Sequence, residues 1–136
     1  MDEDTHAYAR VSEAYGLPRE TAEDKAVRTE AIQKALVIAM DAPLKAVRAC
    51  RTALQAVAGL VDIANKNLIS DVGVAALLAE AALRAAKLNV EINLNSLKDA
   101  SLVAATRAEI EEAAAEAATH ARAVMEKVAP AVGGTL

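Results

Sequence analysis

The chain contains 136 residues with a net charge of −4, a length typical of a single domain. Hydrophobic residues make up 54% of it, but 35 residues are alanine, and Phe and Trp are absent. Aromatic residues and Thr are too scarce for an all-β protein, whereas Ala, Leu, Glu, Lys and Arg are abundant, so we expect an all-α fold. The 15 basic residues are dispersed among 19 acidic ones, which argues against a nucleic-acid-binding protein.

The sequence also lacks the patterns of membrane and secreted proteins. No run of about 18 apolar residues is free of charges. The N-terminus, Met1-Asp2-Glu3-Asp4, is acidic, whereas a signal peptide begins with basic residues. The single cysteine, Cys50, has no partner for an internal disulfide. We therefore expect a soluble cytoplasmic protein with no membrane partner. Its alanine-rich core supplies little buried area per residue, which favours a partner subunit.

The first two predicted helices lie in the N-terminal third of the chain. The first covers about residues 2–15 and ends at Gly16-Leu17-Pro18, because glycine tolerates left-handed geometry and proline does not continue a helix. The second covers about residues 21–40. Thr21 is a favourable N-cap for it, and acidic residues in its first turn suit the helix dipole.

Proline residues mark two further predicted helix boundaries. Asp41-Ala42-Pro43 reads as the end of the second helix and the start of a third, which closes at Asn65-Lys66-Asn67. A fifth helix is expected over about residues 101–128, with Pro130 stopping it. No linker is long enough to divide the chain, so residues 1–136 are expected to form one domain of about five helices.

The fourth predicted helix, about residues 70–94, carries the most information. Apolar residues nearly surround it, which predicts a central, buried helix. Its charged residues share one face, expected to be exposed: Glu80, Arg84, Lys87 and Glu91. Asn89 and Asn93 project to the opposite side, with Asp71 at the helix start. We therefore expect these polar side chains inside the protein or in a cleft.

The asparagine pair allows two interpretations. A buried amide without hydrogen-bond partners costs about 1–3 kcal/mol, so Asn89 and Asn93 either bond to neighbouring helices or line a ligand pocket and orient a polar heterocycle. Lys25 and Arg28 share a helix face, as solvated surface or as a site for an anionic substrate tail.

Acidic residues and one histidine cluster at the N-terminus. Asp2 and Asp4 fit an ordinary acidic helix start, which the helix dipole stabilises. Glu3 and His6 form one Glu-x-x-His motif, but a di-iron bundle needs two such motifs and further glutamates. We therefore expect no metal site.

Four stretches together resemble one known family. They are Asp2-Glu3-Asp4-Thr5 followed by Ala7-Tyr8; Ala14-Tyr15-Gly16-Leu17-Pro18 with Thr21; Lys25-x-x-Arg28 leading to Ala31-Ile32-Gln33; and Ser70-Asp71-x-Gly73-Val74-Ala75-Ala76 leading to Asn89-Val90-x-Ile92-Asn93-Leu94. Their order and spacing over about residues 2–100 resemble the cyclodeaminase/cyclohydrolase family, which includes the C-terminal domain of formiminotransferase-cyclodeaminase and its stand-alone bacterial relatives.

The resemblance implies a fold and a chemistry. It implies an all-α antiparallel bundle that forms homodimers. It also implies either deamination of 5-formiminotetrahydrofolate or hydrolysis of 5,10-methenyltetrahydrofolate, with the folate as substrate and no metal or redox cofactor. Proton transfer at the one-carbon unit suits a positioned carboxylate, for which Asp4 and then Asp2 are the candidates. On the same matched positions, Asp71, Asn89 and Asn93 would orient the pterin, and Lys25 and Arg28 would bind the glutamate tail.

The sequence departs from the family pattern in one respect. Family domains begin with earlier helices and a Gly-rich loop of the Ser-Pro-Thr-Pro-Gly-Gly-Gly-Ser type, and this chain has no such loop. We therefore expect an N-terminally shortened domain. The alternative function is a catalytically inactive helical scaffold or binding module that retains the family fold.

Overall fold

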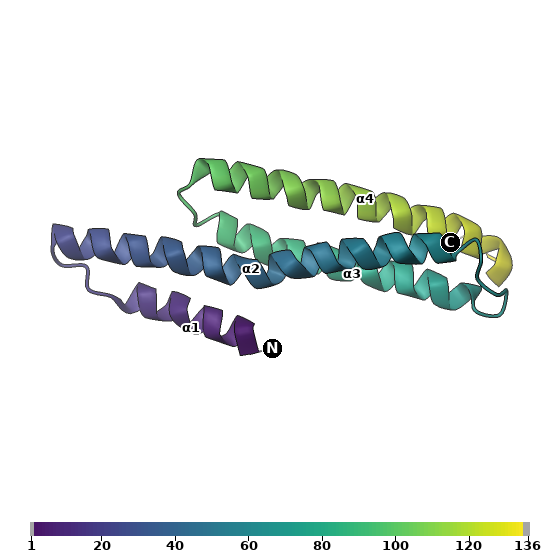
Figure 1. Ribbon diagram of the computed structural model, residues 1–136, viewed down its shortest axis with the longest axis horizontal. Coiled ribbons are helices and arrows are strands. Elements are labelled where there is room, and N and C mark those ends of the chain that lie inside the picture. Colours follow the sequence, from purple (N-terminus) through teal and green to yellow (C-terminus); the bar gives the residue numbers. More distant parts are fainter. Residues whose placement is uncertain (1, 135–136) are drawn as a thin grey trace.

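The computed structural model describes the backbone of residues 2–134 and the side chains of residues 9–134. It contains four helices, α1 (Asp2–Gly16), α2 (Ala22–Leu60), α3 (Ile69–Leu94) and α4 (Ala100–Val132), and no strand within the described range. Consecutive helices run in opposite directions, and α2, α3 and α4 form an elongated three-helix bundle (Figure 1). The shorter α1 packs on α2 alone, along its N-terminal half. The fold is all-α, as expected.

The expected helix break at Asp41-Ala42-Pro43 is wrong, so the structure has four helices rather than five. Pro43 lies inside the 39-residue helix α2. A proline in a helix interior costs about 3 kcal/mol. Met40, Leu44 and Val47 continue at helical spacing across it and are all buried. Because burial of one such side chain contributes about 1.5–3 kcal/mol, packing across the proline outweighs its cost.

The last helix also continues past the expected stop. Pro130 lies inside α4, which ends at Val132 with Gly133 as its C-cap. Gly133 has φ of 76°, a left-handed conformation that suits glycine, and its N–H donates to the carbonyl of Ala129. At the other end Asp99 is the N-cap, since its side chain accepts hydrogen bonds from the backbone N–H groups of Ser101 and Leu102.

The core consists of two unequal clusters. The larger joins α2, α3 and α4, and its largest fully buried side chains are Leu54, Leu83, Leu94, Ile110, Val47, Val90 and Val124. Three alanines of α4, Ala113, Ala117 and Ala121, are buried in it and allow close helix packing. The smaller cluster, Ala14, Ile32, Ala35 and Leu36, fixes α1 to α2. Among the described side chains of α1, Ala14 is the one that is buried in this cluster.

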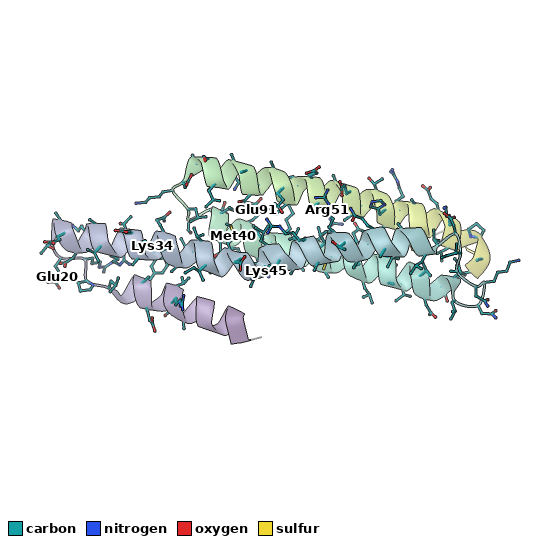
Figure 2. All side chains as sticks on the ribbon, viewed as in Figure 1. Glu20, Lys34, Met40, Lys45, Arg51 and Glu91 are labelled. Carbon is teal, nitrogen blue, oxygen red and sulfur yellow. The ribbon has the colours of Figure 1, made fainter. Side chains whose placement is uncertain are left out.

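The expectation that α3 is central is wrong, and its charged face lies only partly in water: Arg84 is exposed, but Lys87 and Glu91 are half-buried. Lys87 pairs with Glu111 of α4 at 2.7 Å, and Glu91 pairs with Arg107 of α4 at 3.0 Å. Figure 2 shows Glu91 between the two helices. Several large apolar side chains of α3 are also exposed: Val74, Leu77, Leu78, Leu88 and Ile92. The reason is that α3 contacts only α2 and α4, which leaves its remaining surface uncovered.

Of the four helices, considered over the described residues, none combines the length and the apolar character needed to cross a membrane.

Candidate functional site

A cavity of about 590 Å³ lies between α1, α2 and α3, within the size range of small-molecule sites. Its lining residues come from three helices and the loop after α3: Val11, Tyr15, Leu36, Ala39, Ala42, Pro43, Ala46, Ala86, Asn89, Ile92, Asn93 and Ser96. It exists because α1 contacts α2 but does not reach α3. The cavity is therefore a groove along α2, walled by α1 on one side and α3 on the other.

The α3 wall carries the polar groups. Asn89 and Asn93 lie one helical turn apart and both line the cavity, the cleft location that their position on the helix predicts. The side-chain amide nitrogen of Asn93 donates to the backbone carbonyl of Asn89 at 2.9 Å. Among the side chains that the structure describes, neither asparagine bonds to another helix. Apart from the Asn93 nitrogen used in this bond, the two amides carry donors and acceptors that can orient a polar ligand.

The α2 wall is almost entirely apolar. Ala39, Ala42 and Ala46 present only methyl groups, and Pro43 lies among them. Sequence reasoning placed Pro43 at a helix boundary and gave it no role in a site. The cavity thus combines an apolar wall with a polar one, an arrangement that suits a flat heterocycle with hydrogen-bonding edges.

Gln33 of α2 fixes the loop at the end of the α3 wall. Its side-chain nitrogen donates to the carbonyl of Ser96 at 3.0 Å, and its side-chain oxygen accepts from the backbone N–H of Lys98 at 2.7 Å. Because Ser96 lines the cavity, these two bonds position the cavity rim. The sequence motif contained Gln33, but helical periodicity alone did not reveal this bond across 63 residues.

Arg28 of α2 contacts Tyr15, which lies next to the C-terminal residue of α1. Its guanidinium donates to the carbonyl of Tyr15 at 3.1 and 3.3 Å, and its carbon Cζ lies 5.6 Å from the centre of the Tyr15 ring. Tyr15 itself lines the cavity, a role that sequence reasoning missed. Lys25, one turn earlier on α2, is exposed. Neither cation is a lining residue of the cavity.

Asp71 is not brought to the asparagine pair. It lies in the first turn of α3 and is exposed, 18 residues before Asn89. At 1.5 Å per residue this is about 27 Å along the helix. The side chains of Asp2 and Asp4, the expected acid and base, lie outside the described residues, although their backbone belongs to α1.

The charged groups with shifted pKa values lie away from the cavity. Hydrogen bonds from Arg48 lower the pKa of Glu109, and hydrogen bonds from Arg51 lower the pKa of Glu116. Both pairs join α2 to α4, and Figure 2 shows Arg51 between these helices. The described lining residues include no carboxylate, histidine or lysine. The described walls therefore offer hydrogen-bonding groups and apolar surface, but no group that readily gains or loses a proton near neutral pH.

A metal site is also missing from the part of the chain whose side chains are described. There, no three His, Cys, Asp or Glu side chains lie close enough together to hold a metal ion. The Glu3 and His6 pair falls outside this range.

Two proteins are similar to this chain in sequence, and one solved structure is similar to it in fold. It is 40% identical over 126 residues to a methenyltetrahydrofolate cyclohydrolase of Methylorubrum extorquens, covering 93% of this chain and 61% of the relative. It is 34% identical over 125 residues to the formimidoyltransferase-cyclodeaminase of Rattus norvegicus, which covers 92% of this chain and 23% of the rat protein. The crystal structure of a formiminotetrahydrofolate cyclodeaminase from Thermotoga maritima matches with a TM-score of 0.81 at 27% identity, over 96% of this chain and 61% of that one.

The chain thus spans about three fifths of the cyclohydrolase and of the solved cyclodeaminase, and about a quarter of the rat protein. A family model described as formiminotransferase-cyclodeaminase matches residues 1–112, most of the chain. On this match and on its fold, the chain belongs to the formiminotransferase-cyclodeaminase family.

Proposed function

We propose that this protein acts on one-carbon derivatives of tetrahydrofolate, by hydrolysis of 5,10-methenyltetrahydrofolate or by deamination of 5-formiminotetrahydrofolate. The observation that carries the proposal is the cavity with its asparagine pair, in a chain of this family. Hydrolysis is the first choice, since the relative that is 40% identical is named a methenyltetrahydrofolate cyclohydrolase. An inactive helical scaffold with the same fold is the alternative.

In this proposal the cavity holds the pterin. Asn89 and Asn93 offer amide donors and acceptors at one wall, which match the mixed hydrogen-bonding edge of a pterin. Arg28 and Lys25 lie beyond the Tyr15 end, where a glutamate tail leaving the cavity would meet positive charge. Asp71, about 27 Å along α3 from Asn89, would take part only across a contact with a second chain.

The proposed proton carrier is Asp4, with Asp2 second. Both precede Val11 and Tyr15 in the helix that forms one cavity wall. Positions seven apart recur on nearly the same face of a helix, and Asp4 is seven residues before Val11. A carboxylate on this face would supply the acid or base that the described lining residues lack.

The test is turnover of 5,10-methenyltetrahydrofolate, followed as loss of its near-ultraviolet absorbance against buffer. We expect hydrolysis above the buffer rate, and a fall of at least 100-fold in the Asp4→Asn variant, a magnitude typical of lost acid–base catalysis. Glu13→Gln, an exposed acidic residue of the same helix that does not line this cavity, is the matched control. A folded helical protein with the buffer rate would favour the scaffold.

We also propose that the chain forms homodimers through α3. Six exposed residues follow one another at steps of four and three along this helix: Val74, Leu78, Ala81, Ala85, Leu88 and Ile92. The pattern is symmetric about Leu83, with large residues outside and alanines inside. Two antiparallel copies of α3 related by a two-fold axis would therefore place large against large and small against small.

Sedimentation equilibrium tests the dimer. We expect Leu88→Glu to convert the dimer to a folded monomer, because an unpaired carboxylate would be buried at the contact. Ile63→Glu is the matched control, since Ile63 is 79% exposed and lies on the α2–α3 turn outside this stripe. A monomeric parent protein, or dimers that survive Leu88→Glu, would contradict the proposed contact.

A further inference from the structure

A proline inside a helix leaves one backbone carbonyl without its usual donor. Pro43 has no N–H, so it cannot form the bond that residue 43 of a helix would donate to the carbonyl of Ala39. Both Ala39 and Pro43 line the cavity. The carbonyl is directed along the helix axis toward Pro43, so the interrupted bond lies at the cavity wall.

The second proline within a helix provides a contrast. Pro130 of α4 interrupts the corresponding bond to the carbonyl of Glu126, but neither residue lines the cavity. Pro130 is also exposed and only three residues before the helix C-cap, where solvent can reach the carbonyls. Pro43 lies near the middle of its helix, where neighbouring carbonyls keep their intrahelical partners.

The side chains around Ala39 let a ligand approach this carbonyl. Ala39, Ala42 and Ala46 add only methyl groups to the α2 wall, so a flat ligand can lie close to the backbone. None of these side chains, nor Pro43, carries a hydrogen-bond donor. A carbonyl without a donor beside a largely apolar wall is costly to leave unbonded, about 1–3 kcal/mol where it is buried from water.

We propose that the Ala39 carbonyl is a ligand-binding group that accepts a hydrogen bond from an N–H of the bound heterocycle. This inference rests on the proposed function, in which that heterocycle is a reduced pterin with N–H donors on its rings. Asn89 and Asn93 bond to the same ligand from the opposite wall, with both donors and acceptors. The proline thus marks the one position at which α2 contributes a backbone acceptor, and the ligand bridges α2 and α3.

Calorimetric titration with 5-formyltetrahydrofolate, an air-stable reduced folate, tests the inference. Pro43→Ala supplies the missing N–H, so we expect binding to weaken about tenfold while the melting temperature stays equal or rises. Pro130→Ala, the matched control, should leave binding unchanged. A third protein, with the hydroxy-acid analogue of alanine at position 43, has an ester in place of the amide; it lacks both the N–H and the ring, and we expect it to bind like the parent.

A direct readout accompanies the titration. With carbonyl-¹³C alanine, the Ala39 resonance should shift on ligand addition in the parent protein and not in Pro43→Ala. Equal binding by the parent and Pro43→Ala would overturn the inference while leaving the proposed function intact. Failure of the ester protein to bind would do the same, because the ring rather than the carbonyl would then be responsible. A parent protein that binds no reduced folate would overturn the proposed function, and the inference with it.

Discussion

The two sides of the long helix α2 are built differently. Toward α4, Arg48 and Arg51 form two-bond ion pairs with Glu109 and Glu116 above a continuous buried core. Toward α1, the described contact rests on a cluster of four buried residues. The cavity lies on this second side. The α4 side of α2, the closed side, therefore stabilises the fold. The α1 side, the open side, leaves room for a ligand.

Shortening a buried side chain on each side of α2 tests this comparison, and it should give the largest loss of stability. Leu54 is fully buried in the larger cluster, so Leu54→Ala should lower the free energy of unfolding by about 2–5 kcal/mol. Leu36 belongs to the smaller cluster and also lines the cavity, so fewer contacts are lost. We expect Leu36→Ala to cost about half as much. Urea unfolding measures both, and equal costs would show that the two sides are equally well packed.

Sequence reasoning identified the helices better than their ends. The predicted cap at Thr21 is confirmed, because capping is a local property. Ser70 is not the cap of α3, which begins at Ile69 with Leu68 as N-cap and no side-chain cap bond. The helix ends predicted at Pro43 and Pro130 are wrong. A proline indicates a break locally, but packing of the flanking side chains decides whether the helix continues. The exposed apolar face of α3 was also unpredictable, because periodicity does not reveal which neighbours a helix has.

The candidate site shows the same limit. The position of Asn89 and Asn93 opposite the charged face was enough to place them in a cleft. The bonds of Gln33 to the loop at Ser96 join residues 63 apart or more, which no short motif encodes. Tyr15 belonged to a recognised stretch, but its place in the cavity depends on how α1 packs on α2.

Removing one amide from the open side should affect binding rather than folding. We expect Asn93→Ala to weaken binding of 5-formyltetrahydrofolate about tenfold, the value of one or two hydrogen bonds, by calorimetric titration. Its only hydrogen bond in the described protein is local, to the Asn89 carbonyl, so the free energy of unfolding should change by less than about 0.5 kcal/mol. Asn95→Ala, at the exposed C-cap of α3 outside the cavity, should change neither.

A close contact between α3 and α4, which form the closed part of the bundle with α2, should give the next largest change in stability. A Cβ atom added at Gly73 of α3 would lie 3.1 Å from Cγ1 of Val128, which is buried and stiff because it is β-branched. We expect Gly73→Ala to cost about 1 kcal/mol, since crowding exceeds the gain in helix propensity. Gly59→Ala, where nothing lies within 4 Å, should instead stabilise by roughly 0.5 kcal/mol. Thermal unfolding of both variants would reveal the opposite signs, and a stabilised Gly73→Ala would mean that α3 and α4 can separate slightly.

The ion pairs on the closed side should give the smallest effect, and one that depends on pH. Hydrogen bonds from Arg48 lower the pKa of Glu109 below its ordinary value of 4.5, so the pair stabilises the fold above that pH and is lost as the pH falls through the lowered pKa. Since both side chains are partly exposed, Glu109→Gln should cost less than about 1 kcal/mol at pH 7 and almost nothing near pH 2.5. Urea unfolding at the two pH values, with Glu126→Gln as the solvent-exposed control, measures the difference. A cost that persists in acid would arise from packing of the side chain rather than from its charge, and the closed side would then owe its stability to the core alone.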